Sequence, residues 1–278
     1  MSIRNILAIV SVTEGDDPAL EAAEALARHH GAFLTVLVVA WAPGVPLFAD
    51  AWIVDPEWKV TIEGAAKKLE LDRSGIAERI IRNLGEGAAL AFLVDADSPR
   101  MEIAALARCT DLTVISRPRK RVIGDALTPL IEAALFQAGK PVMIIPPFWK
   151  PQQIGRKVAI AWTSRREAAR AVSDALPFLE TAEMVSAITI EKKAKLGEPR
   201  SGLDLQAHLA RHAVDLRLTN LPSSDRPEAT VILEEAAAMD ADLLVMGAYG
   251  HSRFEEFALG GTTREILSYA TIPVLMSH

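Results

Sequence analysis

Three strand-like segments occur twice in this chain, in the same order. The matched pairs are residues 4–11 with 156–163, residues 111–115 with 242–246, and residues 140–144 with 272–276. Between the two copies lies the segment Pro-Pro-Phe-Trp-Lys-Pro-Gln-Gln, residues 146–153, whose prolines and polar residues are typical of a linker. The repeat therefore predicts two tandem domains, residues 1–150 and residues 151–278.

Each half alternates short apolar segments with amphipathic ones, which favours an α/β fold with a parallel sheet and right-handed crossovers. In the second half we expect strands near residues 158–161, 185–190, 215–218 and 243–246, and helices near residues 203–212, 228–238 and 264–270. Ser164 to Glu167 has the pattern of a capping box that opens a further helix. In the first half, Asp17-Pro18 and Ser98-Pro99 predict helix starts, and residues 60–84 predict a long helix.

Composition narrows the class of protein. The chain has 278 residues, of which 50% are hydrophobic, so two domains of this size can each bury a core. The net charge of −6 argues against a nucleic-acid or anionic-membrane surface. Cys109 is the single cysteine, so no intrachain disulfide can form. The apolar run at residues 6–10 is too short for a signal peptide or a membrane span, and we expect a cytoplasmic protein.

The segment with the most specific chemistry lies near the C-terminus, between an apolar strand and a helix. It carries Gly247, Gly250, Gly260 and Gly261, followed by Thr262 and Thr263. A glycine lets a phosphate approach the backbone, and a helix N-terminus offers free N–H groups to an anion. The two threonines could cap the helix and donate hydroxyls to the same anion. The alternative is a glycine-rich turn that only allows the strand to meet the helix.

The order strand, Gly-x2-Gly-x9-Gly loop, capped helix and terminal Ile272-Pro273-Val274 strand resembles the universal stress protein family. The resemblance is strong in the last 40 residues or so, fair in the rest of the second half, and weak in the first half. It implies two tandem doubly wound domains, each with a five-stranded parallel sheet of the Rossmann-like, adenine nucleotide alpha hydrolase-like type. It also implies a ligand at the carboxyl ends of the strands.

The resemblance further implies that ATP or another adenine nucleotide, with Mg²⁺ as a potential companion, binds in the second domain. In the family, the first strand usually ends in an acidic residue that contacts adenine or ribose, and here Thr163 takes that place without a charge. Thr189 would offer main-chain groups beside the base, Met246 would pack on the ribose, and Tyr249 and Arg253 lie within the loop. His251, also in the loop, is the histidine with a plausible ligand role, whereas we interpret His208 and His212 as surface residues.

The first half lacks the glycine loop. Ser116 and Arg119 stand where the second half has Gly247 and Gly250, and Thr128-Pro129 replaces Gly260-Gly261. Side chains would fill the phosphate space, and proline has no N–H to donate. We therefore predict one nucleotide per chain, with the basic residues at positions 117–121 forming either a solvated loop or a site for another anion.

Three functions remain open at this point: a stress-response regulatory protein that binds ATP, a slow ATP hydrolase, and an interaction scaffold with an empty loop. The sequence shows no Gly-x-Ser-x-Gly, P-loop or pyrophosphatase signature, and no evident general base, so we expect a binding module rather than an enzyme. Because the last strand is an apolar edge, we expect the two domains to pair as an intrachain pseudo-dimer, with a homodimer of chains and a protein partner left open.

Overall fold

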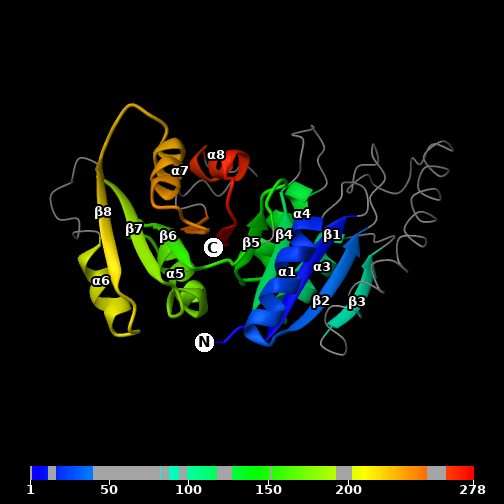
Figure 1. Cartoon of the computed structure of the whole chain (residues 1–278). Coiled ribbons are helices and arrows are strands. Elements are labelled where there is room, and N and C mark those ends of the chain that lie inside the picture. The colour runs from blue at the N-terminus through cyan, green and yellow to red at the C-terminus, as the bar shows by residue number, and fades with distance from the viewer. Residues whose placement is uncertain are drawn as a thin grey trace. The chain divides into compact units, whose positions relative to one another are not determined.

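The structure is a computed structural model that describes residues 2–11, 17–39, 82, 88–93, 99–117, 127–150, 152–191, 202–248 and 261–278. It divides into two compact units, residues 2–151 and residues 152–278. Each unit is an α/β domain with five parallel strands, called the first and the second sheet below (Figure 1). The predicted α/β class is therefore confirmed, whereas the helix expected at residues 60–84 lies outside the described residues.

The first unit contains five parallel strands in the order β3-β2-β1-β4-β5. The strands are β1 (Asn5–Ser11), β2 (Phe33–Val39), β3 (Ala88–Leu93), β4 (Leu112–Ser116) and β5 (Val142–Ile145). The described helices are α1 (Asp17–His30), α3 (Pro99–Arg108) and α4 (Leu127–Gln137). Both Pro-containing helix starts that the sequence indicated are present, at Asp17 and at Pro99.

The second unit repeats this topology, with strand order β8-β7-β6-β9-β10 and parallel pairing throughout. Its strands are β6 (Lys157–Ala161), β7 (Met184–Glu191), β8 (Leu216–Pro222), β9 (Leu243–Gly247) and β10 (Val274–Ser277). Its helices are α5 (Arg166–Leu179), α6 (Leu203–Ala210), α7 (Glu228–Ala238) and α8 (Gly261–Tyr269). In order of appearance along the chain, both sheets run 3-2-1-4-5, so the sequence repeat corresponds to a repeated fold.

The helices cover both faces of the second sheet. Right-handed crossovers place α5 and α6 on one face and α7 and α8 on the other (Figure 1). The central strands are therefore buried on both sides, and all four residues of β10 are buried. Helix α5 turns the small residues Ala168, Ala171 and Ala175 inward, which lets it lie close to the sheet.

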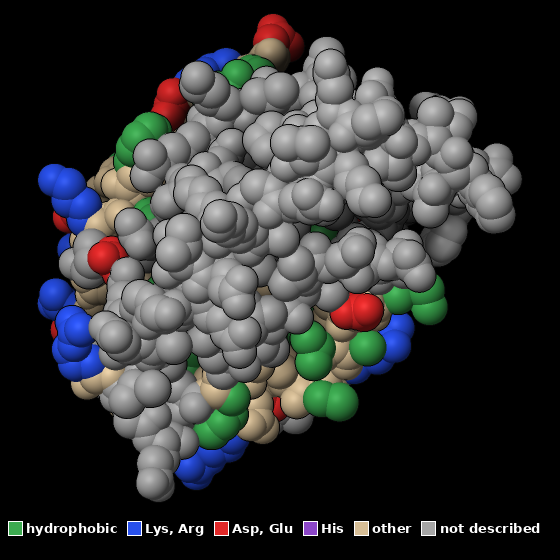
Figure 2. All heavy atoms as spheres, turned by 90° about the vertical axis from the view of Figure 1, so that its right-hand side faces the viewer, with side chains coloured by type: hydrophobic (Ala, Val, Ile, Leu, Met, Phe, Trp, Pro, Cys, Tyr) green, Lys and Arg blue, Asp and Glu red, His purple; other side chains and the backbone are tan. Residues whose placement is uncertain are grey.

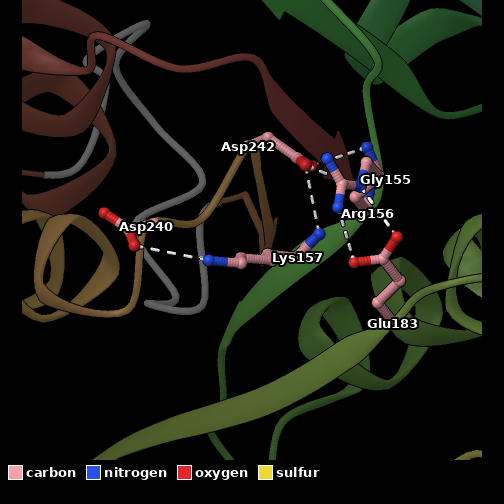
Figure 3. Close-up of polar contacts among 6 residues, drawn as sticks. All are labelled: Gly155, Arg156, Lys157, Glu183, Asp240 and Asp242. Atoms are coloured by element: carbon pink, nitrogen blue, oxygen red, sulfur yellow. Dashed lines mark hydrogen bonds and ion pairs between the residues drawn. The ribbon is translucent and has the colours of Figure 1, made fainter.

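An aspartate fastens the amino end of the first strand in each unit. In the second unit, the Asp242 carboxylate accepts hydrogen bonds from the N–H groups of Gly155 at 2.7 Å, Arg156 at 3.1 Å and Lys157 at 3.1 Å (Figure 3). In the first unit, Asp111 accepts from Arg4 at 2.8 Å and from Asn5 at 3.0 Å. These backbone donors lie at or just before the first paired residue of each strand, where the carboxylate satisfies them.

Salt bridges add to this amino edge of the second sheet. The Arg156 guanidinium binds Glu183 through two hydrogen bonds of 2.9 and 2.7 Å, and the Lys157 ammonium lies 3.3 Å from Asp240 (Figure 3). The hydrogen bond with Arg156 lowers the pKa of Glu183 below its ordinary value. Both pairs are solvent-exposed, so they orient the strand ends more than they stabilise the fold.

The described surface mixes charges of both signs. On the face shown in Figure 2, described basic side chains lie in separate groups among acidic ones, and hydrophobic side chains form small patches between them. Among the helices that the structure describes, none is both long and apolar enough to cross a bilayer.

Candidate functional site

The order in which strands are added to the second sheet reverses between β6 and β9, and the carboxyl ends of these two strands lie at the same edge. From β6 the chain crosses through α5 to β7 on one side, and from β9 it crosses through α8 to β10 on the other. Strands β6 and β9 are neighbours, with Ala161 paired with Met246. In doubly wound sheets the gap above such a pair of strands is where ligands bind.

Residues 162–165 lead from β6 into α5. The Trp162 N–H donates to the Ile188 carbonyl at 2.9 Å, which extends the pairing with β7 by one residue. The Arg165 N–H then donates to the Thr163 carbonyl at 2.7 Å, which closes a tight three-residue turn. Thr163, Ser164 and Arg165 are all exposed at this edge.

The predicted capping box at Ser164 is wrong. Helix α5 begins one residue later than expected, with Arg165 as its N-cap and no side-chain cap hydrogen bond. The carboxylate of Glu167, which was expected to reach back to Ser164, instead accepts a hydrogen bond from Arg166 Nε at 2.6 Å. Glu167 is drawn inward because its backbone lies against β9, and its side chain is only 9% exposed.

Gly247, at the end of β9, allows this close approach of α5. A Cβ built on Gly247 would lie 2.5 Å from the Ala168 nitrogen, 2.5 Å from the Glu167 carbonyl carbon and 2.9 Å from the Glu167 Cβ. No side chain can occupy that space without moving the first turn of the helix. The structure thus gives Gly247 a packing role, which the sequence-based interpretation as a phosphate-binding glycine did not include.

The buried Glu167 carboxylate is electrostatically supported. Burial opposes its ionisation, but hydrogen bonds from Arg166 and from its own N–H, with the charge of His278, hold the pKa of Glu167 below its ordinary value. The His278 ring is itself positioned by a 3.0 Å contact between its Nδ1 and the Ala248 carbonyl. Glu167 is therefore an ionised side chain and a weak base.

Thr189 lies at the carboxyl end of β7 and is buried. Its hydroxyl donates to the side-chain carbonyl of Asn220, which is its register partner on β8. The side chain is therefore engaged within the sheet, and only main-chain groups of Thr189 are candidates for a ligand contact, as the sequence interpretation had it. Met246, just before Gly247, is 6% exposed.

Helix α8 begins at Gly261, three residues earlier than the predicted start at 264. Thr262 and Thr263 consequently lie in the first helical turn rather than at the cap. The Thr263 side chain is buried, whereas the Thr262 hydroxyl donates to Glu228 Oε2 at 3.5 Å. Gly261 is exposed, and a Cβ built on it would meet nothing within 4 Å. The first-turn N–H groups have no partner within the helix and can receive an anion.

The remaining loop residues of the predicted site, Tyr249, Gly250, Arg253 and Gly260, lie outside the described residues, as does His251. Within the described part of the chain, Thr163, Met246 and Gly247 belong to the carboxyl edge where β6 and β9 end, Thr189 to the end of the adjoining β7, and Gly261 and Thr262 to the α8 N-terminus. No group of three His, Cys, Asp or Glu side chains in that part could hold a metal ion.

The corresponding edge of the first unit differs. Ser116 ends β4 and is 3% exposed, with a hydroxyl that has no hydrogen-bond partner among the described residues. The Arg117 N–H donates to the Ile145 carbonyl at 2.8 Å and so prolongs the pairing with β5. Thr128 and Pro129 lie in the first turn of α4. The first unit therefore has a side chain, that of Ser116, at the position where the second unit has Gly247.

Two features of the sheet edges were not predicted from the sequence. The first is the hydrogen bonding of Asp111 and Asp242 to backbone N–H groups at the start of the first strand of each unit. An aspartate directly before the fourth strand in both halves was the signal that could have indicated it. The indole N–H of Trp162 is buried and has no partner in the described structure, and no local pattern marks it.

Together, the two 3-2-1-4-5 strand orders and the helices on both faces define a doubly wound α/β protein. Residues 156–278 match the Universal stress protein family. The match covers nearly the whole of the second unit, which is therefore similar to this family.

Individual relatives agree with this assignment. A universal stress protein of Synechocystis sp. is 48% identical over 48 residues, a match that spans 17% of this chain and only 16% of that relative. A universal stress protein structure from Archaeoglobus fulgidus DSM 4304 superposes with a TM-score of 0.69 at 15% identity, over 98% of this chain and 95% of the other. A functionally unknown protein from Pseudomonas aeruginosa PAO1 gives a TM-score of 0.59 at 16% identity, over 99% and 92% of the two chains. At these identities the structural likenesses establish the fold.

Proposed function

We propose that the second unit binds an adenine nucleotide, with ATP as the expected ligand, and that the chain is a regulatory stress-response protein. The observation that carries this proposal is the placement of Gly261 at the start of α8. Gly261 is exposed, and a side chain added to it would enter open space. In the sequence it directly follows the glycine-rich segment that resembles the universal stress protein loop. Backbone N–H groups at such a helix start are suited to phosphate oxygens.

The proposal treats the protein as a binding module. Within the described part of this edge, the buried carboxylate of Glu167 has a lowered pKa and is already hydrogen-bonded to Arg166. A carboxylate in that state is a poor general base for activating water. We therefore expect hydrolysis of bound ATP, if measured, to be far slower than the roughly 1 per second of ordinary enzymes.

Isothermal titration calorimetry of the full chain with ATP, ADP and AMP, with and without Mg²⁺, tests the proposal. We expect saturation near one nucleotide per chain. Gly250→Asp should abolish binding through bulk and like charge. Equal affinity in Gly250→Asp and the natural protein would contradict the assigned phosphate site, and the absence of binding by the natural protein would favour a nucleotide-free scaffold.

A further inference from the structure

We propose that His278 positions the start of the glycine-bearing segment in the second unit, by fixing the backbone of Ala248, the residue at which the chain leaves β9. This inference rests on the proposed nucleotide binding, because it names a residue on which the affinity of that site depends. His278 would act through the Ala248 backbone rather than by touching the ligand, which makes it a positioning residue. The proposal is carried by the hydrogen bonds that join the carboxyl ends of β9 and β10.

Ala248 is held at both of its backbone polar groups. Its N–H donates to the Ser277 carbonyl at 2.8 Å, and its carbonyl oxygen lies 3.0 Å from Nδ1 of the His278 ring. Because a carbonyl oxygen can only accept, Nδ1 must carry a proton, either in the imidazolium or in the Nδ1–H tautomer. Ala248 itself is fully buried. The two peptide groups that meet at Ala248 are therefore both fixed by consecutive residues at the end of β10.

The end of β10 is itself fastened to α5. The Ser277 hydroxyl, on a buried residue, donates to Asp174 Oδ2 at 2.9 Å. The same carboxylate oxygen accepts a hydrogen bond from Arg170 Nε at 2.7 Å. The Asp174 side chain is only 12% exposed, so solvent screens these contacts less than it screens a surface ion pair. His278 therefore directly follows a residue that is bound both to the sheet and to a helix.

The first unit provides an internal comparison. Its Arg117 N–H donates to the Ile145 carbonyl at 2.8 Å, just as the Ala248 N–H donates to the end of β10. The residue after this strand is Pro146, where the second unit has His278, and a proline side chain has no hydrogen-bond donor. The backbone pairing is thus common to both units, whereas the imidazole accompanies the unit whose sequence carries the glycines. This difference favours a role in the glycine-bearing segment over a role in the shared fold.

Calorimetric titration of the full chain with ATP, together with amide hydrogen exchange at Ala248 measured by NMR, tests the proposal. His278→Phe keeps a flat ring but removes the donor. We expect this variant to bind ATP roughly three- to tenfold more weakly, which corresponds to the loss of one hydrogen bond. Exchange of the Ala248 amide should become faster by a similar factor. His278→Asn offers an amide N–H₂ in place of Nδ1, and it should restore most of the affinity and of the protection from exchange.

His212→Phe is the matched control, because it removes a histidine of the same unit whose Nδ1 lies 3.6 Å from Glu180 Oε1, and it should leave both measurements unchanged. Unchanged ATP affinity in His278→Phe, in a natural protein that binds ATP, would overturn the inference and leave nucleotide binding intact. An Asn variant as impaired as the Phe variant would also overturn it. If the natural protein binds no adenine nucleotide, the proposed function itself fails. Faster exchange in His278→Phe would then still support the fixing of Ala248, and unchanged exchange would refute it.

Discussion

Gly247 and Glu167 lie so close that a Cβ on the glycine would come within 2.9 Å of the Glu167 Cβ, and the α5 backbone is closer still. Residues 80 positions apart thus meet at the point where α5 crosses the end of β9. This contact connects the packing of the second unit to the edge at which we propose the nucleotide binds.

The contact predicts that Gly247→Ala destabilises the second unit. Because backbone atoms of α5 must move to admit the methyl group, we expect a loss of about 1–3 kcal/mol in the free energy of unfolding. The matched variant is Gly261→Ala, where the added methyl group meets nothing and helix propensity improves. Urea unfolding should show a lower midpoint for Gly247→Ala and an unchanged or higher one for Gly261→Ala. Equal midpoints for Gly247→Ala and the natural protein would show that α5 can shift without cost.

Gly247→Ala and Gly261→Ala also distinguish an effect on the packing of the fold from an effect on nucleotide affinity. Gly261→Ala should weaken nucleotide affinity, because its methyl group intrudes where a phosphate would approach the first-turn N–H groups, while the fold stays intact. Calorimetry at a temperature well below the unfolding transition measures this. Unchanged affinity in Gly261→Ala would place the phosphates elsewhere.

Loss of the hydrogen bonds from the N–H groups of residues 155–157 to the Asp242 carboxylate should destabilise the second unit. Asp242→Asn keeps one acceptor oxygen but turns an amide N–H₂ toward backbone donors, which leaves at least one of the three N–H groups without its acceptor; those of Gly155 and Lys157 are part-buried. We expect a loss of roughly 1–3 kcal/mol, measured by urea unfolding. Asp240→Asn is the control, since Asp240 is exposed and makes a single surface ion pair with Lys157, and its effect should stay within about 0.5 kcal/mol. Comparable losses in both variants would contradict a specific stabilising role of the Asp242 hydrogen bonds.

Glu167 should make stability depend on pH. Its pKa in the folded protein lies below the ordinary value of 4.5, so the folded state favours the ionised form. Its contribution is therefore fully present above about pH 4.5 and is lost as the pH falls through the lower folded pKa. Glu167→Gln should be less stable than the natural protein at pH 7, and the difference should shrink on acidification. Thermal unfolding across this pH range measures the gap, and a gap that widens toward low pH would mean that the sign is wrong.

The difference between the carboxyl edges of the two sheets predicts one nucleotide site per chain. Ser116 stands where the second half has Gly247, and the first half has Thr128-Pro129 in place of Gly260-Gly261. We expect titration with a labelled ATP analogue to saturate near one per chain, and Gly250→Asp to remove that single site. Two equivalent sites in the natural protein, or a full site remaining in Gly250→Asp, would show that the first unit also binds nucleotide.

The sequence by itself determined the α/β class, the repeat of strand segments and the family resemblance of the second half. Those features are local: buried parallel strands are continuous apolar runs, and a Gly-rich segment between a strand and a helix is visible in a short window. Helix α7 was predicted with its observed bounds for the same reason, since its apolar positions recur with the helical period.

Only the tertiary structure decided which residues meet across the fold. The start of α5 was misplaced because Glu167 turned out to be buried against β9 and bound to Arg166, so the capping box could not form. The hydrogen bonds of Thr189 with Asn220 and of Asp242 with residues 155–157 are likewise contacts between distant segments. Periodicity and propensity describe neighbours along the chain, whereas these contacts depend on strand order and register, which arise only when the sheet assembles.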